Sequence, residues 1–240
     1  MGRVEDLGTA KPHERRASAG VSAAVERPRE RLLRRGARAL GDAELLAVLL
    51  GTGVSGLSAV ALAARLLSRC GGIAGLLSGE PDAVLAERGV GPAKLAVILA
   101  ARELALRSAE EPLRQGDVMG NPAATRRFVG QHLGSRDREV FSCLFLNAQH
   151  RLLRCEDLFL GTLDGAAVYP REVAVRALRY RAAAVIFAHN HPSGMANPSA
   201  ADRQITERLQ HALALLDVRV LDHLIVGQGS SFSFAEAGLL

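Results

Sequence analysis

The sequence predicts an α/β (α+β) domain that is preceded by a small all-α domain and an N-terminal tail. Short apolar segments of helical length, separated by glycine turns, fill residues 28–108. From residue 139 onward, strand-like segments rich in β-branched and aromatic residues alternate with helical ones, as in a sheet flanked by helices. With 48% hydrophobic residues, the 240-residue chain can also bury a substantial core.

The first part of the chain is predicted to be a tail followed by the helical domain. Residues 1–27 mix Gly, Ala, Ser, Arg and Glu with few large apolar residues, so we expect a disordered basic tail. Residues 28–108 form the helical domain, where Asp42 and Ser58 are suitable N-cap residues and glycines end the helices. The expected helices lie at 43–50, 59–70, 81–89 and 93–107.

A linker and a second domain are expected to follow. Residues 109–117 (AEEPLRQGD) are polar and contain a proline and a glycine, so we assign them to a linker, and 118–240 to the α/β domain. The turn-forming residues 147–150 suit a hairpin between the first two strands. The expected strands lie at 139–146, 151–160, 183–188, 218–226 and 230–234, and the expected helices at 122–133, 171–180 and 199–216.

Charge and composition exclude several classes of protein. The net charge is +5, and the first forty residues account for all of it. This argues against a histone-like or duplex-coating protein, in which positive charge would cover the folded part, although a local phosphate site is still allowed. The chain has no apolar run of the roughly 20 residues that span a membrane. It has no export signal either, so we expect a cytoplasmic protein with no membrane partner.

The motif with the clearest chemistry is HNHPSGMANPSAAD at 189–202. His189 and His191, two residues apart at the end of a predicted buried strand, point to the same side. Asp202 returns in the first turn of the next helix and can supply a third ligand. Two imidazoles and a carboxylate suit zinc, and three protein ligands leave a fourth position for water, as in catalytic zinc sites. The three cysteines have no CxxC spacing, so a thiolate zinc site is not indicated.

The same residues also have other interpretations. Ser199 and Asp202 also have the spacing of a capping box at a helix N-terminus, and this role is compatible with a metal site. Histidine pairs of the metallo-β-lactamase and cupin types need further ligands that are missing here. A nucleoside-type deaminase needs H-x-E and C-x-x-C, which the chain lacks.

The spacing of His189, His191, Ser199 and Asp202 resembles the JAMM motif of the MPN+ metalloprotease domain. The fuller wording HNHPSG…NPS…D, with YPRE upstream and LDHLIVG downstream, resembles the RadC family over about residues 27–240. The resemblance implies a cytidine-deaminase-like MPN fold in which His189, His191 and Asp202 bind one Zn²⁺ and Ser199 assists the water or the oxyanion. It also implies a hydrolase of peptide or isopeptide bonds, and the family carries a traditional label of DNA repair.

A site of this type also needs an upstream glutamate as the general base. Glu139, which opens the strand EVFSCLFLN, is the best match, because a carboxylate near the metal-bound water can take its proton and pass it to the leaving amine. The competitor is Glu172 in YPRE. An acid is favoured there in any case, since it stands at the start of a helix.

A second candidate site lies in the helical domain. Gly89-Val-Gly91-Pro-Ala-Lys94 resembles a helix-hairpin-helix turn, in which backbone N–H groups hold a DNA phosphate at a helix N-terminus and Lys94 adds charge. The plain alternative is a turn that only joins two helices. If DNA binding is the main role, the protein is a DNA-associated accessory protein whose metal site is structural or vestigial.

The remaining histidines and cysteines suggest ordinary roles. His223, in the strand-like run LDHLIVG, is interpreted as a hydrogen-bonded structural residue, and His132 as a surface residue. Cys143 and Cys155 fall in strand-like segments and are expected to be core thiols. No pattern in the sequence indicates an oligomeric state.

Overall fold

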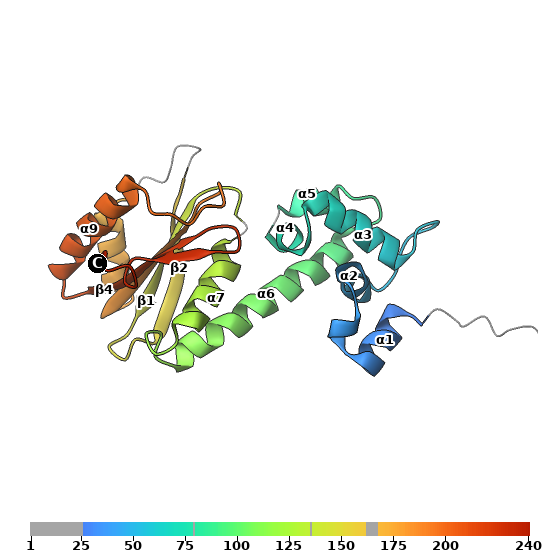
Figure 1. Cartoon of the computed structure of the whole chain (residues 1–240), viewed down its shortest axis with the longest axis horizontal. Helices are drawn as coiled ribbons and strands as arrows, with labels where there is room; N and C mark the ends of the chain where they lie inside the picture. Colours follow the sequence, from blue (N-terminus) through green and yellow to red (C-terminus); the bar gives the residue numbers. More distant parts are fainter. Residues whose placement is uncertain (1–25, 79, 135, 162–167) are drawn as a thin grey trace, which may run out of the picture. The chain divides into compact units, whose positions relative to one another are not determined.

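The structure is a computed structural model that describes residues 26–78, 80–134, 136–161 and 168–240 (Figure 1). The predicted tail, 1–27, therefore lies outside the described residues except for its last two. The chain divides into two compact units, Met1–Leu40 and Gly41–Leu240. The predicted helical and α/β parts thus share one unit, and the structure does not divide the chain at 109–117.

The first unit contains helix α1, Pro28–Arg35, and a 3₁₀ turn, Ala37–Ala39. Pro28 stands in the first turn, where its missing N–H costs no hydrogen bond. At the other end of the helix, Arg34 and Arg35 both pair with Glu26, at 3.0 and 3.2 Å. The helix therefore combines a proline start with cations near its C-terminus, which suits its dipole.

The helical part of the second unit packs around a small apolar core. Its helices are α2 (Asp42–Leu50), α3 (Ala59–Cys70), α4 (Ile73–Ser78), α5 (Pro81–Leu85) and the first half of α6 (Pro92–Gln115). The predicted N-cap Ser58 is confirmed, because its hydroxyl accepts a hydrogen bond from the N–H of Ala61 at 3.2 Å. Asp42 is instead the first residue of α2, and α4 was not predicted. Leu62, Leu66 and Ile98 are fully buried in this core.

The residues predicted to form a linker, 109–117, lie mostly within α6, which continues to Gln115 with Pro112 inside it. Ala109 and Leu113 are buried in the core beneath the sheet, so tertiary packing supports the helix across the unfavourable Pro112. Glu110 pairs with Arg114 one turn later, at 2.8 Å, and adds local support. Neither α6 nor any other helix in the described ranges has the length and apolarity that a membrane span requires.

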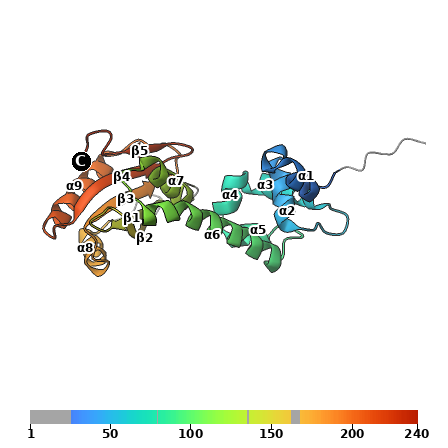
Figure 2. The ribbon, with the colours of Figure 1, turned by 90° about the horizontal axis from the view of Figure 1, so that it is seen from below.

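The remainder of the unit is built on a five-stranded sheet. Its strands are β1 (Val140–Leu146), β2 (Leu152–Leu160), β3 (Ala184–Asn190), β4 (Arg219–Val226) and β5 (Ser231–Ser233). Their order is β2-β1-β3-β4-β5, as Figure 2 shows, with β3 and β4 parallel and the other neighbours antiparallel. The predicted hairpin is confirmed: the Asn147 side chain accepts hydrogen bonds from the N–H groups of Gln149 and Arg151 in its turn.

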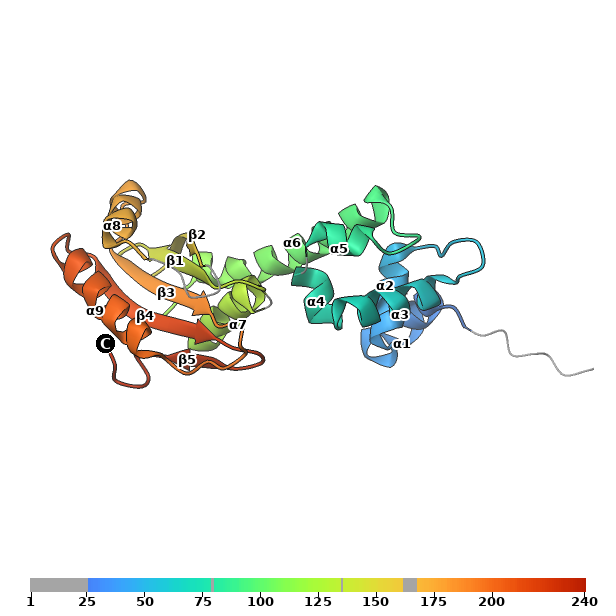
Figure 3. The ribbon, with the colours of Figure 1, turned by 90° about the horizontal axis from the view of Figure 1, so that it is seen from above.

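Helices cover both faces of this sheet (Figure 3). On one face lie α8 (Pro170–Arg179) and α9 (Ala200–Ala214), and on the other lie α7 (Pro122–Leu133) and the end of α6. In β3, Val185 and Phe187 pack toward α8 and α9, whereas Ile186 and Ala188 pack toward α7. Alternation along the strand therefore places His189 on the α9 side.

A polar cluster bridges α7 and the edge of the sheet. Asp157 accepts a hydrogen bond from the Ser142 hydroxyl at 2.6 Å, contacts His132 Nε2 at 2.6 Å and pairs with Arg136 at 3.3 Å. The prediction that His132 is a simple surface residue is therefore wrong. Burial alone would raise the pKa of Asp157, but the hydrogen bonds from His132 and Ser142 outweigh burial and lower it.

We expect Asp157→Asn to lower the free energy of unfolding by roughly 1–2 kcal/mol at pH 7, because the amide cannot accept all of these bonds. The ionised Asp157 stabilises the fold fully above the unfolded pKa of about 4, and the effect is lost as pH falls through the lower folded pKa. Urea unfolding of both proteins between pH 7 and pH 3 measures the gap. A gap that widens toward pH 3 contradicts this assignment, and Asp137→Asn, at an exposed site, is the control.

Candidate metal centre

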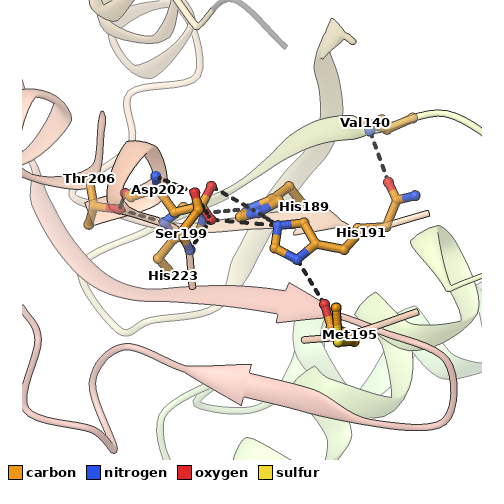
Figure 4. Close-up of polar contacts among 9 residues, drawn as sticks. Val140, His189, His191, Met195, Ser199, Asp202, Thr206 and His223 are labelled. Carbon is orange, nitrogen blue, oxygen red and sulfur yellow. Dashed lines mark hydrogen bonds and ion pairs between the residues drawn. The ribbon is translucent and has the colours of Figure 1, made fainter. Parts of the chain in front are cut away.

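Three potential metal ligands converge where β3 ends beside the N-terminus of α9 (Figure 4). His189 Nε2 lies 3.0 Å from His191 Nε2 and 3.2 Å from Asp202 Oδ1, and His191 Nε2 lies 3.5 Å from Asp202 Oδ2. Tetrahedral zinc with ligand bonds near 2.0–2.1 Å requires ligand atoms about 3.3 Å apart. The donor set and its spacing therefore fit a metal ion held by the three predicted ligands.

The start of α9 holds Asp202 in place. Ser199 is the N-cap: its hydroxyl accepts from the N–H of Asp202 at 3.1 Å, while its own N–H donates to Asp202 Oδ2 at 2.7 Å. The Ser199 hydroxyl also donates to Oδ2, at 2.6 Å. The second carboxylate oxygen, Oδ1, faces His189. The capping box and the ligand position thus coexist in one carboxylate, which is the compatibility that the sequence predicted.

The charge of Asp202 suits a cation. Burial alone would raise the pKa of its carboxyl, but the close contact with His189 and the hydrogen bonds from Ser199 outweigh burial and hold the pKa well below its usual range. The carboxylate is therefore ionised at neutral pH. A ligand carboxylate in this state needs no proton release when a divalent ion binds.

A backbone carbonyl orients His191. Its Nδ1 lies 2.8 Å from the carbonyl oxygen of Met195, which can only accept a hydrogen bond (Figure 4). Nδ1 therefore carries the proton, and Nε2 presents its lone pair to the other two ligands. The loop can close in this way because Gly194 adopts a left-handed conformation with φ +85°.

His189 is oriented by a third histidine. Its Nδ1 lies 2.8 Å from Nε2 of His223 on β4, whose Nδ1 in turn lies 2.6 Å from the hydroxyl of Thr206 on α9. Burial lowers the pKa of His223 well below its usual range, and the neighbouring His189 lowers it further. The interpretation of His223 as a hydrogen-bonded structural residue is confirmed, but its direct contact with a ligand was not predicted.

Glu139 precedes β1 on the face of the sheet that carries the ligands. Phe141 is the register partner of His189, and Glu139 stands two residues before Phe141, so strand alternation directs both to the α9 side. Among the described residues no hydrogen bond or ion pair occupies the Glu139 carboxylate. Its position is compatible with the predicted role of a general base.

Asn190 fixes the backbone that carries Glu139. Its buried side chain accepts from the N–H of Val140 at 2.8 Å and donates to the carbonyls of Arg138 and Arg136, at 2.9 and 3.2 Å. The role of Asn190 was not predicted from the sequence. Asparagine between two histidines is a weak signal, because its partners lie some fifty residues away in the chain.

The competing base, Glu172, lies in the first turn of α8. It is half-exposed and pairs with the adjacent Arg171 at 3.5 Å. Within the described ranges no contact joins it to the ligand cluster. The structure thus brings His189, His191, Ser199 and Asp202 together, with Glu139 on the same face, and leaves Glu172 outside this cluster.

The glycine turn of the helical part is also well defined. Gly89 has φ +100°, and a Cβ there would meet a methyl group of Val54 at 2.8 Å, so the turn requires glycine. Gly91 is the N-cap of α6. The Lys94 ammonium donates to the carbonyl of Gly89 at 2.9 Å and to that of Gly53 at 3.5 Å. Lys94 therefore ties two glycine turns together, and its contribution to phosphate binding stays a prediction.

We expect Lys94→Met to lower the free energy of unfolding by about 1 kcal/mol, because the carbonyls of Gly89 and Gly53 lose their donor. Urea unfolding monitored by circular dichroism measures this change. The control is Arg88→Met, at an exposed position of the same turn, which should be nearly neutral. Equal effects of the two substitutions would contradict the structural role of Lys94.

Comparisons with known proteins match two parts of the chain to family models. The family model described as the RadC-like JAB domain matches residues 119–239, and the one described as UPF0758 N-terminal matches residues 11–96. Proteins named "UPF0758 protein" from Marinobacter nauticus, Aeromonas hydrophila and Nitrosococcus oceani are each 54% identical over 215 residues, covering 90% of this chain and 96% of theirs. The first match includes the three candidate metal ligands and Glu139.

Proposed function

The chain belongs to the family of the RadC-like JAB domain, and on that premise we propose that it is a zinc-dependent hydrolase of peptide or isopeptide bonds. The observation that carries this proposal is the convergence of His189, His191 and Asp202 at one end of β3, with Glu139 on the same face of the sheet. This arrangement supports a metal site for which Glu139 would act as the general base.

The ligand set favours zinc. Two neutral imidazoles and one carboxylate are common zinc ligands, whereas Mg²⁺ and Ca²⁺ favour sites made of oxygen atoms. Three protein ligands leave a coordination position for water or substrate. When bound in such a site, zinc lowers the pKa of water to about 7 and polarises a carbonyl oxygen.

Side chains near the metal site would carry out proton transfer and stabilise the oxyanion. Glu139 accepts the proton of the attacking water and later delivers it to the nitrogen of the leaving amine. Ser199 donates a hydrogen bond to the oxyanion, for which its hydroxyl turns away from Asp202 Oδ2. The positive end of the α9 dipole also favours negative charge at this place.

Metal content and hydrolysis test the proposal together. We expect protein purified with added Zn²⁺ to hold about one zinc per chain and to cleave members of a panel of fluorogenic peptides and isopeptides. Chelation should abolish cleavage, and added Zn²⁺ should restore it. If the protein holds no stoichiometric zinc under these conditions, the proposal is wrong. Stoichiometric zinc without cleavage of any substrate supports a structural or vestigial site.

A second candidate function is association with DNA, as an accessory protein or as a means of placing the hydrolase near DNA. The glycine turn Gly89–Gly91 at the N-terminus of α6 favours it, because such turns present N–H groups to phosphate. Binding to duplex DNA should fall steeply with salt concentration. The test compares the full chain with a variant lacking residues 1–27. Binding that disappears with those residues would eliminate the turn as its cause.

A further inference from the structure

We propose that Thr206 and His223 are positioning residues that hold His189 in the one tautomer able to bind a metal. This inference goes beyond the proposed function but rests on its metal site. The observation behind it is an uninterrupted chain of hydrogen bonds that runs from a backbone carbonyl of α9, through β4, to the ligand on β3.

The direction of every bond in this chain follows from its first member. The Thr206 hydroxyl lies 2.5 Å from the carbonyl oxygen of Asp202, which can only accept, so the hydroxyl donates to it. The hydroxyl oxygen is then the acceptor for His223 Nδ1, at 2.6 Å, and Nδ1 of His223 must carry a proton. Since a neutral imidazole carries one proton, Nε2 of His223 has a lone pair.

The proton position on His223 determines the proton position on His189. His223 Nε2 accepts a hydrogen bond from His189 Nδ1 across 2.8 Å, so the proton of His189 also resides on Nδ1. Nε2 of His189 is left with its lone pair, and this is the atom that faces His191 and Asp202. If the chain ran in the opposite direction, a proton on His189 Nε2 would occupy the position of the metal.

The surroundings keep His223 neutral and prevent its ring from turning. Its side chain is fully buried: the Phe234 ring stacks on it with the centroids 4.9 Å apart, and the Phe141 and Phe187 rings lie in T-shaped arrangements with centroids at 5.5 and 5.9 Å. An apolar enclosure of this kind disfavours the imidazolium form. Because the ring is held by its neighbours, the hydroxyl of Thr206 is the group that selects the tautomer.

The position of Thr206 also couples two ligands. It stands one helical turn after Asp202 on α9 and bonds to the carbonyl of that same residue. The same turn of α9 therefore supplies the carboxylate ligand and the hydroxyl that orients His223, which in turn contacts His189. Neither Thr206 nor His223 belongs to the candidate ligand cluster, so they would act on a bound metal through His189.

The test compares Thr206→Val, which keeps the shape but removes the hydroxyl, with Thr206→Ser, which keeps the hydroxyl. Long-range ¹H–¹⁵N NMR spectra of the metal-free wild-type protein should show His189 and His223 protonated at Nδ1. Zn²⁺ affinity is measured by competition with a chromophoric chelator. We expect Thr206→Val to bind Zn²⁺ about 10–100-fold more weakly and Thr206→Ser to stay close to the wild type.

Two results would overturn the inference: a proton on Nε2 of His189 in the wild-type protein, or a folded Thr206→Val variant with unchanged Zn²⁺ affinity. The NMR measurement uses the metal-free wild-type protein alone, so it tests the proton positions on His189 and His223 even if Thr206→Val does not fold. A protein with the expected tautomers and affinities that cleaves no peptide bond argues against the proposed hydrolase alone.

Discussion

Substitution of His189 by Ala is expected to abolish zinc binding and, with it, hydrolysis. His189 is the central ligand, since its Nε2 lies within 3.2 Å of donor atoms of both other ligands. Loss of one of three protein ligands leaves only two, which do not hold zinc stoichiometrically. A catalytic metal contributes several kcal/mol to the transition state, so hydrolysis should fall on the order of 10³-fold or more.

Zinc content by elemental analysis and the rate of peptide cleavage measure this effect. The matched control is His211→Ala, which removes an exposed histidine from α9, the helix that carries Asp202. The control should keep zinc and activity. Because His189 is buried, circular dichroism must show that His189→Ala is folded. A folded His189→Ala protein with one zinc per chain would contradict the assignment of this ligand.

Glu139→Gln is expected to separate metal binding from catalysis. The amide has nearly the shape of the carboxylate but cannot accept a proton, so cleavage should fall about 10²–10⁴-fold. Zinc content should not change, because the three ligands His189, His191 and Asp202 remain. The rate is measured on the substrate that the wild-type protein cleaves best.

The competing glutamate provides the control for this experiment. Glu172→Gln removes the alternative carboxylate in the first turn of α8, which lies outside the ligand cluster, and it should leave the rate near that of the wild type. A large loss with Glu172→Gln and none with Glu139→Gln would reverse the assignment. Loss of zinc from Glu139→Gln would show that Glu139 acts on the metal site itself.

The sequence was most informative where short-range chemistry determines the structure. Ser58 was recognisable as an N-cap, and the turn at Asn147 was recognisable from its residues. The ligand cluster was predictable for the same reason. His189 and His191 are two residues apart, and the capping geometry of Ser199 fixes the place of Asp202 within one helical turn.

Long-range packing accounts for what the sequence did not reveal. The extension of α6 to Gln115 depends on burial of Leu113 under a sheet whose strands follow later in the chain. The contact of His223 with His189 depends on the parallel pairing of β3 with β4, in which Phe187 is the register partner of His223. No local pattern encodes that pairing, so a buried histidine in a strand could be identified only as hydrogen-bonded.

The tripeptide His189-Asn190-His191 connects the candidate ligands to the backbone that carries Glu139. Two of its side chains belong to the cluster that could hold a metal ion, and the amide between them holds the backbone on either side of Glu139. A displacement of the end of β3 would therefore move the Glu139 backbone together with the side chains of His189 and His191. If Glu139 is the general base, its distance from a metal bound at this site would change little when the sheet fluctuates.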